Sequence, residues 1–263
     1  MKKYQKYLFI LIMLFISPLF VKAAECDLTY KEAQQMIQES MKAYYIRGPY
    51  FQYNSAKYAG VNNGYILPEE GTSQENNYLV CSGFVHASLK TSFGINNTKN
   101  FESTTSLLKY GKEKQSNKNL ILFYGNNGTK YNGTYKKFVD LIQPGDIFVY
   151  TGHTMVAYQK VDTNNDKEVD DILLLHSWQA PYIKSRLDST FRLSYNNSSS
   201  EYNYINGLPT HKEGTVKQVL LSDFSEFVKN GNIQCTKDEC TVIRPFYDVN
   251  GIAKFNSFLW NKW

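Results

Sequence analysis

The sequence has few of the features that mark nucleic-acid-binding, metal-binding and membrane proteins. Its formal net charge is +5, but four lysines and no acid lie in the first 23 residues, and without them the charge falls to +1. No basic surface for nucleic acid is therefore expected. The four cysteines and four histidines lack zinc-ligand spacing such as Cys-x-x-Cys. We expect no nucleic-acid partner and no metal or other cofactor.

Long apolar runs are also missing, apart from one near the N-terminus. The run Leu8–Val21 has about fourteen residues, whereas a membrane-spanning helix needs roughly 20. Lysines precede the run, and Ala23 and Ala24 follow it, which is typical of a secretory signal peptide cleaved after Ala23. We expect residues 1–23 to be this signal and residues 24–263 to form a single secreted domain, in the medium or associated with the cell wall. A retained N-terminal anchor is the alternative; after cleavage no stable membrane insertion is expected.

The cysteines of an exported chain can form disulfides. Cys235 and Cys240 bracket a polar hairpin tip and can bridge across it. An alternative pairs all four cysteines, including Cys26 and Cys81, in a purely structural role.

The order of the predicted elements indicates an α+β domain. Apolar residues recur at helical spacing over Leu28–Tyr45, and this helix ends before Gly48-Pro49. A long irregular connection, 49–76, follows. Later helices are expected after Cys81 and over Ser103–Tyr110, with a short apolar run at Leu120–Tyr124. A series of antiparallel strands is then predicted at Ile147–Tyr150, His153–Val161, Asp171–Trp178, Lys184–Leu193, Val216–Leu221 and Thr241–Arg244.

Cys81 is the candidate nucleophile. A strand-like run, Tyr78–Val80, meets the small residues Cys81-Ser82-Gly83, and helical periodicity begins at Phe84. Cys81 therefore lies at or just before the first turn of a helix. There, unpaired backbone N–H groups and the helix dipole favour a thiolate.

Two histidines are candidates for the base that a cysteine nucleophile needs. His86 lies about 140° around the helix from Cys81, and His211 lies in a polar loop. His153 opens a predicted strand, and His176 lies near the end of the next one. In a hairpin both imidazoles can lie on one face, but a slip of one residue in register would turn His176 away.

The loop between these two strands resembles half of an EF-hand loop. Asp162–Asp171 has the alternating oxygen-bearing residues, but Lys167 replaces the glycine at position six and Leu173 the glutamate at position twelve. We interpret the loop as a solvated hairpin tip, with calcium binding as the alternative.

Four motifs in this order resemble the NlpC-type papain-like cell-wall endopeptidases, over about Ala33 to Arg244: Cys81-Ser82-Gly83-Phe84-Val85, Gln143-Pro144-Gly145-Asp146-Ile147-Phe148-Val149, Gly152-His153 and Leu175-His176-Ser177. The resemblance implies a papain-like fold, with N-terminal helices packed on a C-terminal antiparallel sheet. It also implies Cys81 as nucleophile, His153 as general base and His176 as the orienting residue. Gly48-Pro49-Tyr50 resembles the element whose tyrosine lies near the oxyanion, which gives Tyr50 that role.

The chain departs from the family pattern at three points. Val80 stands where the family usually has Asp, the span from Tyr50 to Cys81 is longer, and the loop between the two histidine strands is expanded. The resemblance implies hydrolysis of amide bonds in peptidoglycan stem peptides. A second interpretation keeps the same triad for an amidase cut or an acyl transfer. A third makes the chain a secreted binding domain with Cys81 in a disulfide.

Overall fold

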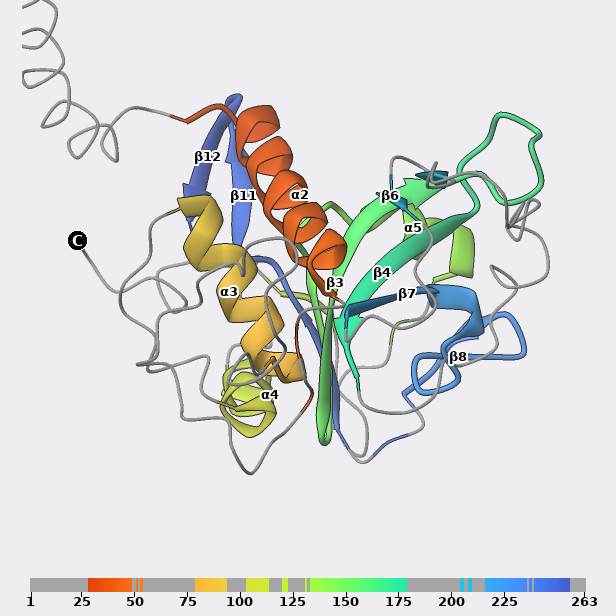
Figure 1. Ribbon diagram of the computed structural model, residues 1–263. Helices are drawn as coiled ribbons and strands as arrows, with labels where there is room; N and C mark the ends of the chain where they lie inside the picture. The colour runs from red at the N-terminus through yellow and green to blue at the C-terminus, as the bar shows by residue number, and fades with distance from the viewer. Residues whose placement is uncertain are drawn as a thin grey trace, which may run out of the picture.

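The computed structural model describes a central antiparallel β-sheet with α2, α3 and α4 on one side and α5 and β8 on the other (Figure 1). The residues described are 28–48, 51, 53, 79–93, 103–113, 120–122, 131, 133–178, 204–205, 208–209, 216–235, 237 and 239–255. The predicted signal peptide 1–23, the predicted strand Lys184–Leu193, Cys26, Tyr50 and His211 lie outside them. In the described part of the chain, no helix is long and apolar enough to cross a membrane.

Six described strands form the central sheet, in the spatial order β1-β10-β2-β3-β4-β7, and every neighbouring pair is antiparallel. The strands β2, β3 and β4 follow one another in the chain, and β10, from the C-terminal part, pairs with β2. The bounds are β1 Leu120–Leu122, β2 Ile147–Tyr150, β3 His153–Val161, β4 Asp171–Ser177, β7 Val216–Leu220 and β10 Cys240–Ile243.

The sequence predicted these strands closely. The predictions Ile147–Tyr150 and His153–Val161 are confirmed residue for residue. The predicted strands Asp171–Trp178 and Val216–Leu221 are one residue too long at the C-terminal end, and Thr241–Arg244 is shifted by one residue at both ends. The α+β class is also confirmed. Three two-stranded sheets were not predicted: β5 Tyr204–Ile205 with β6 Leu208–Pro209, β8 Val228–Lys229 with β9 Asn232–Ile233, and β11 Phe246–Val249 with β12 Ile252–Phe255.

Four helices lie around the sheet in the described residues: α2 Tyr30–Ile46, α3 Cys81–Phe93, α4 Thr104–Glu113 and α5 Tyr135–Leu141. The first three match predicted helices, whereas α5 was not predicted as one. A capping box fixes the start of α2: Thr29 Oγ1 accepts from the Glu32 N–H at 3.2 Å, and the Thr29 N–H donates to Glu32 Oε2 at 3.0 Å. Such caps are worth about 1 kcal/mol.

Helices α2 and α3 pack together as well as on the sheet. The Ser40 hydroxyl donates to the Ser88 carbonyl at 2.8 Å, and the Ser92 hydroxyl donates to the Met36 carbonyl at 3.2 Å. These two bonds cross from one helix to the other and fix their relative height. They therefore hold α3, and with it Cys81 at its N-terminal end, in place on the sheet.

Alternate residues of each strand point to opposite faces of the sheet, and a hydrophobic core buries each of the two faces. One core joins the sheet to α2, α3 and α4 through residues such as Ile147, Val149, Val156 and Leu175. The other joins it to α5 and to the segment that begins with the short helix η3, Leu221–Asp223, through Phe148, Met155, Leu174, Phe224 and Phe227. A sheet covered on both faces gives the strand ends a rigid support.

The turn before β2 is tied to the end of β10 by a buried ion pair. Arg244 Nε and Nη2 donate to the two carboxylate oxygens of Asp146 at 3.0 and 2.9 Å. The Gln143 N–H donates to the same carboxylate at 2.7 Å. The Asp146 side chain is 1% exposed, so its buried negative charge needs the positive charge of Arg244 as a partner.

Candidate active site

Cys81 is the first residue of α3, as the sequence predicts. Its side chain is buried and its sulfur is a free thiol. The backbone N–H groups of Thr154, Ser82 and Cys81 and the hydroxyl of Tyr53 lie near the sulfur as donors, and each lowers the pKa of the thiol. Two of these N–H groups belong to the first turn of the helix, where they have no partner within the helix itself. The sulfur therefore lies where the dipole and the free donors of α3 converge.

Two further contacts bring the histidine strands to this sulfur. Thr154, whose N–H lies near the sulfur, is the residue after His153. Ser177, the residue after His176, donates its hydroxyl to the Leu79 carbonyl at 2.6 Å. The ends of β3 and β4 are thus both fixed to the chain around the start of α3. His153 and His176 are joined to each other and lie on strands whose ends are near the start of α3; their catalytic roles with Cys81 stay predictions.

The hairpin that carries His153 is tight. Tyr150 of β2 is the cross-strand partner of His153, and only Thr151 and Gly152 lie between them. Gly152 has φ +92°, a left-handed conformation that a residue with a Cβ adopts only with strain. This short turn fixes the height of His153 at the edge of the sheet.

The two imidazoles are joined directly. His153 Nε2 and His176 Nδ1 are 2.7 Å apart, and the two residues are 1% and 3% exposed. The other ring nitrogen of His153, Nδ1, has no hydrogen-bond partner among the described residues. A buried nitrogen of this kind is available to exchange a proton with a neighbouring group.

A bulge in β3 places His176 on the correct face. The two strands pair in two registers that differ by one residue, first Val156 with Leu175 and Ala157 with Leu174, then Gln159 with Leu173, Lys160 with Ile172 and Val161 with Asp171. Tyr158 is the extra residue. Continuing the first register puts Met155 opposite His176, so that His176 shares a face with Met155 and His153. Continuing the second would put His176 opposite Val156, on the other face.

Aromatic rings enclose the two histidines. The Trp178 ring lies edge-to-face with the His153 ring at a centroid distance of 4.3 Å, and the Tyr150 ring lies 5.5 Å from it. Phe224 lies 6.2 Å from His176, edge-on. Tyr53 in turn contacts Trp178 at 6.3 Å. These rings keep water from the imidazoles and limit their rotation.

Burial sets the protonation of the site. It raises the pKa of the Cys81 thiol, and the nearby donor groups only partly oppose this. Burial lowers the pKa of His153 well below its usual range, and His176 adds to the effect. Burial and then Lys217 lower the pKa of His176 to about 3. The resting pair is therefore a thiol and a neutral imidazole. The donors at the helix N-terminus lower the pKa of the thiol, as expected, whereas burial raises it; a thiolate during the reaction stays a prediction.

Tyr53 is a site residue that the sequence analysis did not identify. Its hydroxyl lies near the sulfur, and burial, followed by the nearby sulfur, raises its pKa to about 12. The hydroxyl therefore stays protonated and can donate a hydrogen bond throughout the neutral range. Tyr50, which the family resemblance put in this role, lies outside the described residues and stays a prediction. The only signal for Tyr53 was its position three residues after Tyr50.

The remaining candidates lie elsewhere. His86 is buried within α3, where burial lowers its pKa to about 4; it belongs to the packing of that helix. The loop between β3 and β4 forms the predicted hairpin tip, with exposed residues 164–169. There Asp162 accepts from the backbone N–H groups of Asn164, Asp166 and Lys167. Within the described ranges, no group of three or more His, Cys, Asp or Glu residues could hold a metal ion.

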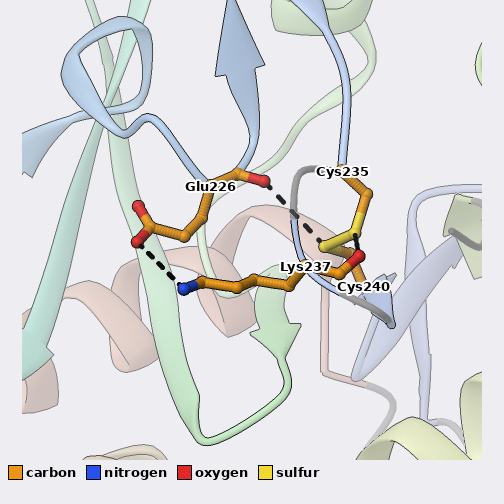
Figure 2. Close-up of a disulfide and its surroundings, with 4 residues drawn as sticks. All are labelled: Glu226, Cys235, Lys237 and Cys240. Atoms are coloured by element: carbon orange, nitrogen blue, oxygen red, sulfur yellow. Dashed lines mark hydrogen bonds and ion pairs between the residues drawn. A yellow bond between two sulfur atoms is a disulfide. The ribbon is translucent and has the colours of Figure 1, made fainter.

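Cys235 and Cys240 form the predicted disulfide, shown in Figure 2. Lys237, between them, pairs with Glu226 at 3.8 Å and lies over the Tyr150 ring at 5.9 Å. The Thr151 N–H also donates to the Glu239 carbonyl at 3.1 Å. The bridged loop therefore supports the turn that precedes His153.

Comparison of the chain with protein-family models, with curated proteins and with solved structures finds no significant match.

Proposed function

We propose that the protein is a cysteine amidohydrolase with a papain-like fold of the NlpC type, secreted to act on amide bonds in peptidoglycan stem peptides. The observation that supports it most is one arrangement: a free thiol at a helix N-terminus, next to Thr154, the residue after a histidine that is hydrogen-bonded to a second histidine at 2.7 Å. A nucleophile, a base and a group that orients the base are the parts that acyl transfer requires.

The first step is attack on the substrate carbonyl. His153 Nδ1 accepts the proton of the Cys81 thiol as the sulfur attacks the carbonyl carbon. For this, the His153 proton must be on Nε2, from which it donates to His176 Nδ1. His176 thereby selects the tautomer in which Nδ1 has a free lone pair. Because the resting pair is neutral, the two charges form only as the reaction proceeds.

The developing oxyanion needs hydrogen-bond donors. The backbone N–H of Cys81 and the hydroxyl of Tyr53 lie close enough to the sulfur to lower the pKa of its thiol, and we assign them as donors to the oxyanion. Donors fixed in advance in a site that excludes water stabilise the transition state strongly. We therefore assign to Tyr53 the oxyanion-stabilising role that the family resemblance gave to Tyr50.

The second half of the reaction releases the products. Imidazolium His153 gives its proton to the leaving amine, and a thioester forms at Cys81. Water then attacks the thioester, with His153 accepting its proton, and the carboxylic acid product leaves. His153 and the thiol return to their neutral forms.

Digestion of purified peptidoglycan fragments, followed by mass spectrometry, tests the proposal. Hydrolysis adds one water to the summed mass of the two products, whereas an acyl transferase joins the acyl group to an amine acceptor. The Cys81→Ala variant, with its fold checked by circular dichroism, should be inactive. Products without the water, or equal hydrolysis by the variant, would overturn the proposal.

A further inference from the structure

The proposed reaction needs His153 to be the donor and His176 the acceptor of the hydrogen bond between the two imidazoles. If His176 is neutral, its Nδ1 can accept from the Nε2–H of His153, and His153 Nδ1 keeps a free lone pair. If His176 is protonated, both of its nitrogens carry hydrogen. Its Nδ1–H must then donate to His153 Nε2, which moves the His153 proton to Nδ1. His153 can no longer act as a base, so the site needs a neutral His176.

A lysine lies opposite His176 on the neighbouring strand. In the antiparallel pair of β4 and β7, Lys217 is the cross-strand partner of His176. Directly opposed residues point to the same face, with Cβ atoms about 4.5–5.5 Å apart. Lys217 is half-buried, so the interaction between its charge and the imidazole is only partly screened.

Among the residues that the structure describes, the other groups that face His176 do not supply a compensating negative charge. From β3 the facing group is His153, hydrogen-bonded to His176 at 2.7 Å, and burial lowers the pKa of His153 so that it is neutral at rest. Trp178, at the end of β4, and Phe224, after η3, contribute uncharged rings. Asp171, at the far end of β4, is held by the hydroxyls of Tyr135 and Ser222.

We infer that Lys217 is a positioning residue that keeps His176 neutral, so that His176 accepts the hydrogen bond from His153 under acidic as well as neutral conditions. The ammonium group disfavours a second positive charge on the opposite strand. Lys217 would thus extend the acid side of the pH range in which the base can function. This role rests on the proposed function, because the tautomer of His153 matters only if His153 accepts the thiol proton.

Substitutions of Lys217 that change its charge test the inference. The pH profile of kcat/KM would be compared for Lys217→Arg, Lys217→Met and Lys217→Glu, with Lys229→Met, on an exposed part of β8, as the control. We expect the acid limb to stay in place for Lys217→Arg and Lys229→Met. It should move to higher pH for Lys217→Met, by about one pH unit, and further for Lys217→Glu. The rate on the neutral plateau should be unchanged.

A second measurement does not depend on activity. In the inactive Cys81→Ala background, ¹⁵N NMR of the His176 ring reports its second protonation directly, and this step should move to higher pH in the same order of variants. If it does while no variant hydrolyses any substrate, the proposed function fails and the effect of Lys217 on His176 stands. If hydrolysis is observed but both the acid limb and the NMR titration stay fixed, or if only KM changes, the inference is wrong.

Discussion

His153 and His176 are hydrogen-bonded through Nε2 and Nδ1 at 2.7 Å, although they are not opposite each other on their strands. The amide oxygen of asparagine occupies nearly the same place as Nδ1 of histidine and accepts the same bond. His176→Asn should therefore keep kcat/KM within about tenfold of the parent, whereas His176→Leu, which cannot accept, should lose about 100-fold. Steady-state kinetics with a defined wall peptide measures both. Equal losses in the two variants would show that acceptance of this bond is not what His176 contributes.

Tyr53 and Tyr50 can be distinguished by removing one oxygen atom from each. If the Tyr53 hydroxyl stabilises the oxyanion, Tyr53→Phe should lower kcat about 100-fold with little change in KM. Tyr50→Phe is the matched control and should keep nearly full activity. The reverse result would return the role to Tyr50.

The pH dependence of alkylation tests the resting state of the thiol. Burial raises the pKa of Cys81, so below that pKa the thiolate fraction falls as the pH falls. The rate of reaction with iodoacetamide should therefore drop about tenfold per pH unit between about pH 8 and pH 6. Cys81→Ser supplies the background rate. A plateau in the acidic range would instead show a preformed thiolate–imidazolium pair.

Arg244 is expected to be the most sensitive charged residue for stability. Arg244→Met leaves the Asp146 carboxylate buried without its partner and should lower the free energy of unfolding by about 3–5 kcal/mol. Arg244→Lys, which keeps the charge but not the two-bond geometry, should lose less. Urea denaturation followed by circular dichroism compares them. A loss below about 1 kcal/mol for Arg244→Met would mean that the pair behaves as an ordinary surface ion pair.

The bridge between Cys235 and Cys240 closes a very short loop. Replacing both cysteines with alanine should lower the free energy of unfolding by about 2 kcal/mol. This loss is at the low end for a disulfide because the loop-closure entropy that a bridge removes grows with loop length, and this loop is short. The same denaturation experiment measures it, with the reduced and oxidised parent as the comparison. If reduction leaves the parent's stability unchanged, the bridge is not a structural support for the turn before His153.

Local patterns were sufficient for much of this structure. The apolar residues of β2 and β3 and the small residues before Phe84 predicted both strands and the start of α3. These signals are carried by residues close together in the sequence. The hairpin β11–β12 was missed, and so was the helical nature of α5, which has only seven residues.

The rest of the site depends on contacts between distant segments. The register that turns His176 toward His153 is set by a bulge at Tyr158, which no local pattern marks. The raised pKa of Cys81 comes from burial beneath elements far away in the chain. Tyr53 and Trp178 reach the site only once their segments fold against it. Sequence reasoning therefore singled out Cys81, His153 and His176, whose catalytic roles stay predictions, but not the surroundings that set their charge.

The measurement that bears most directly on the proposed chemistry is capture of the acyl-enzyme. Rapid acid quenching of the protein with a purified stem peptide, followed by peptide mapping, should show the acyl fragment attached to Cys81 in the parent and in a slowed His176→Leu variant. Hydrolysis that proceeds with no adduct at Cys81, and that persists in Cys81→Ala, would contradict the assignment of Cys81 as the nucleophile.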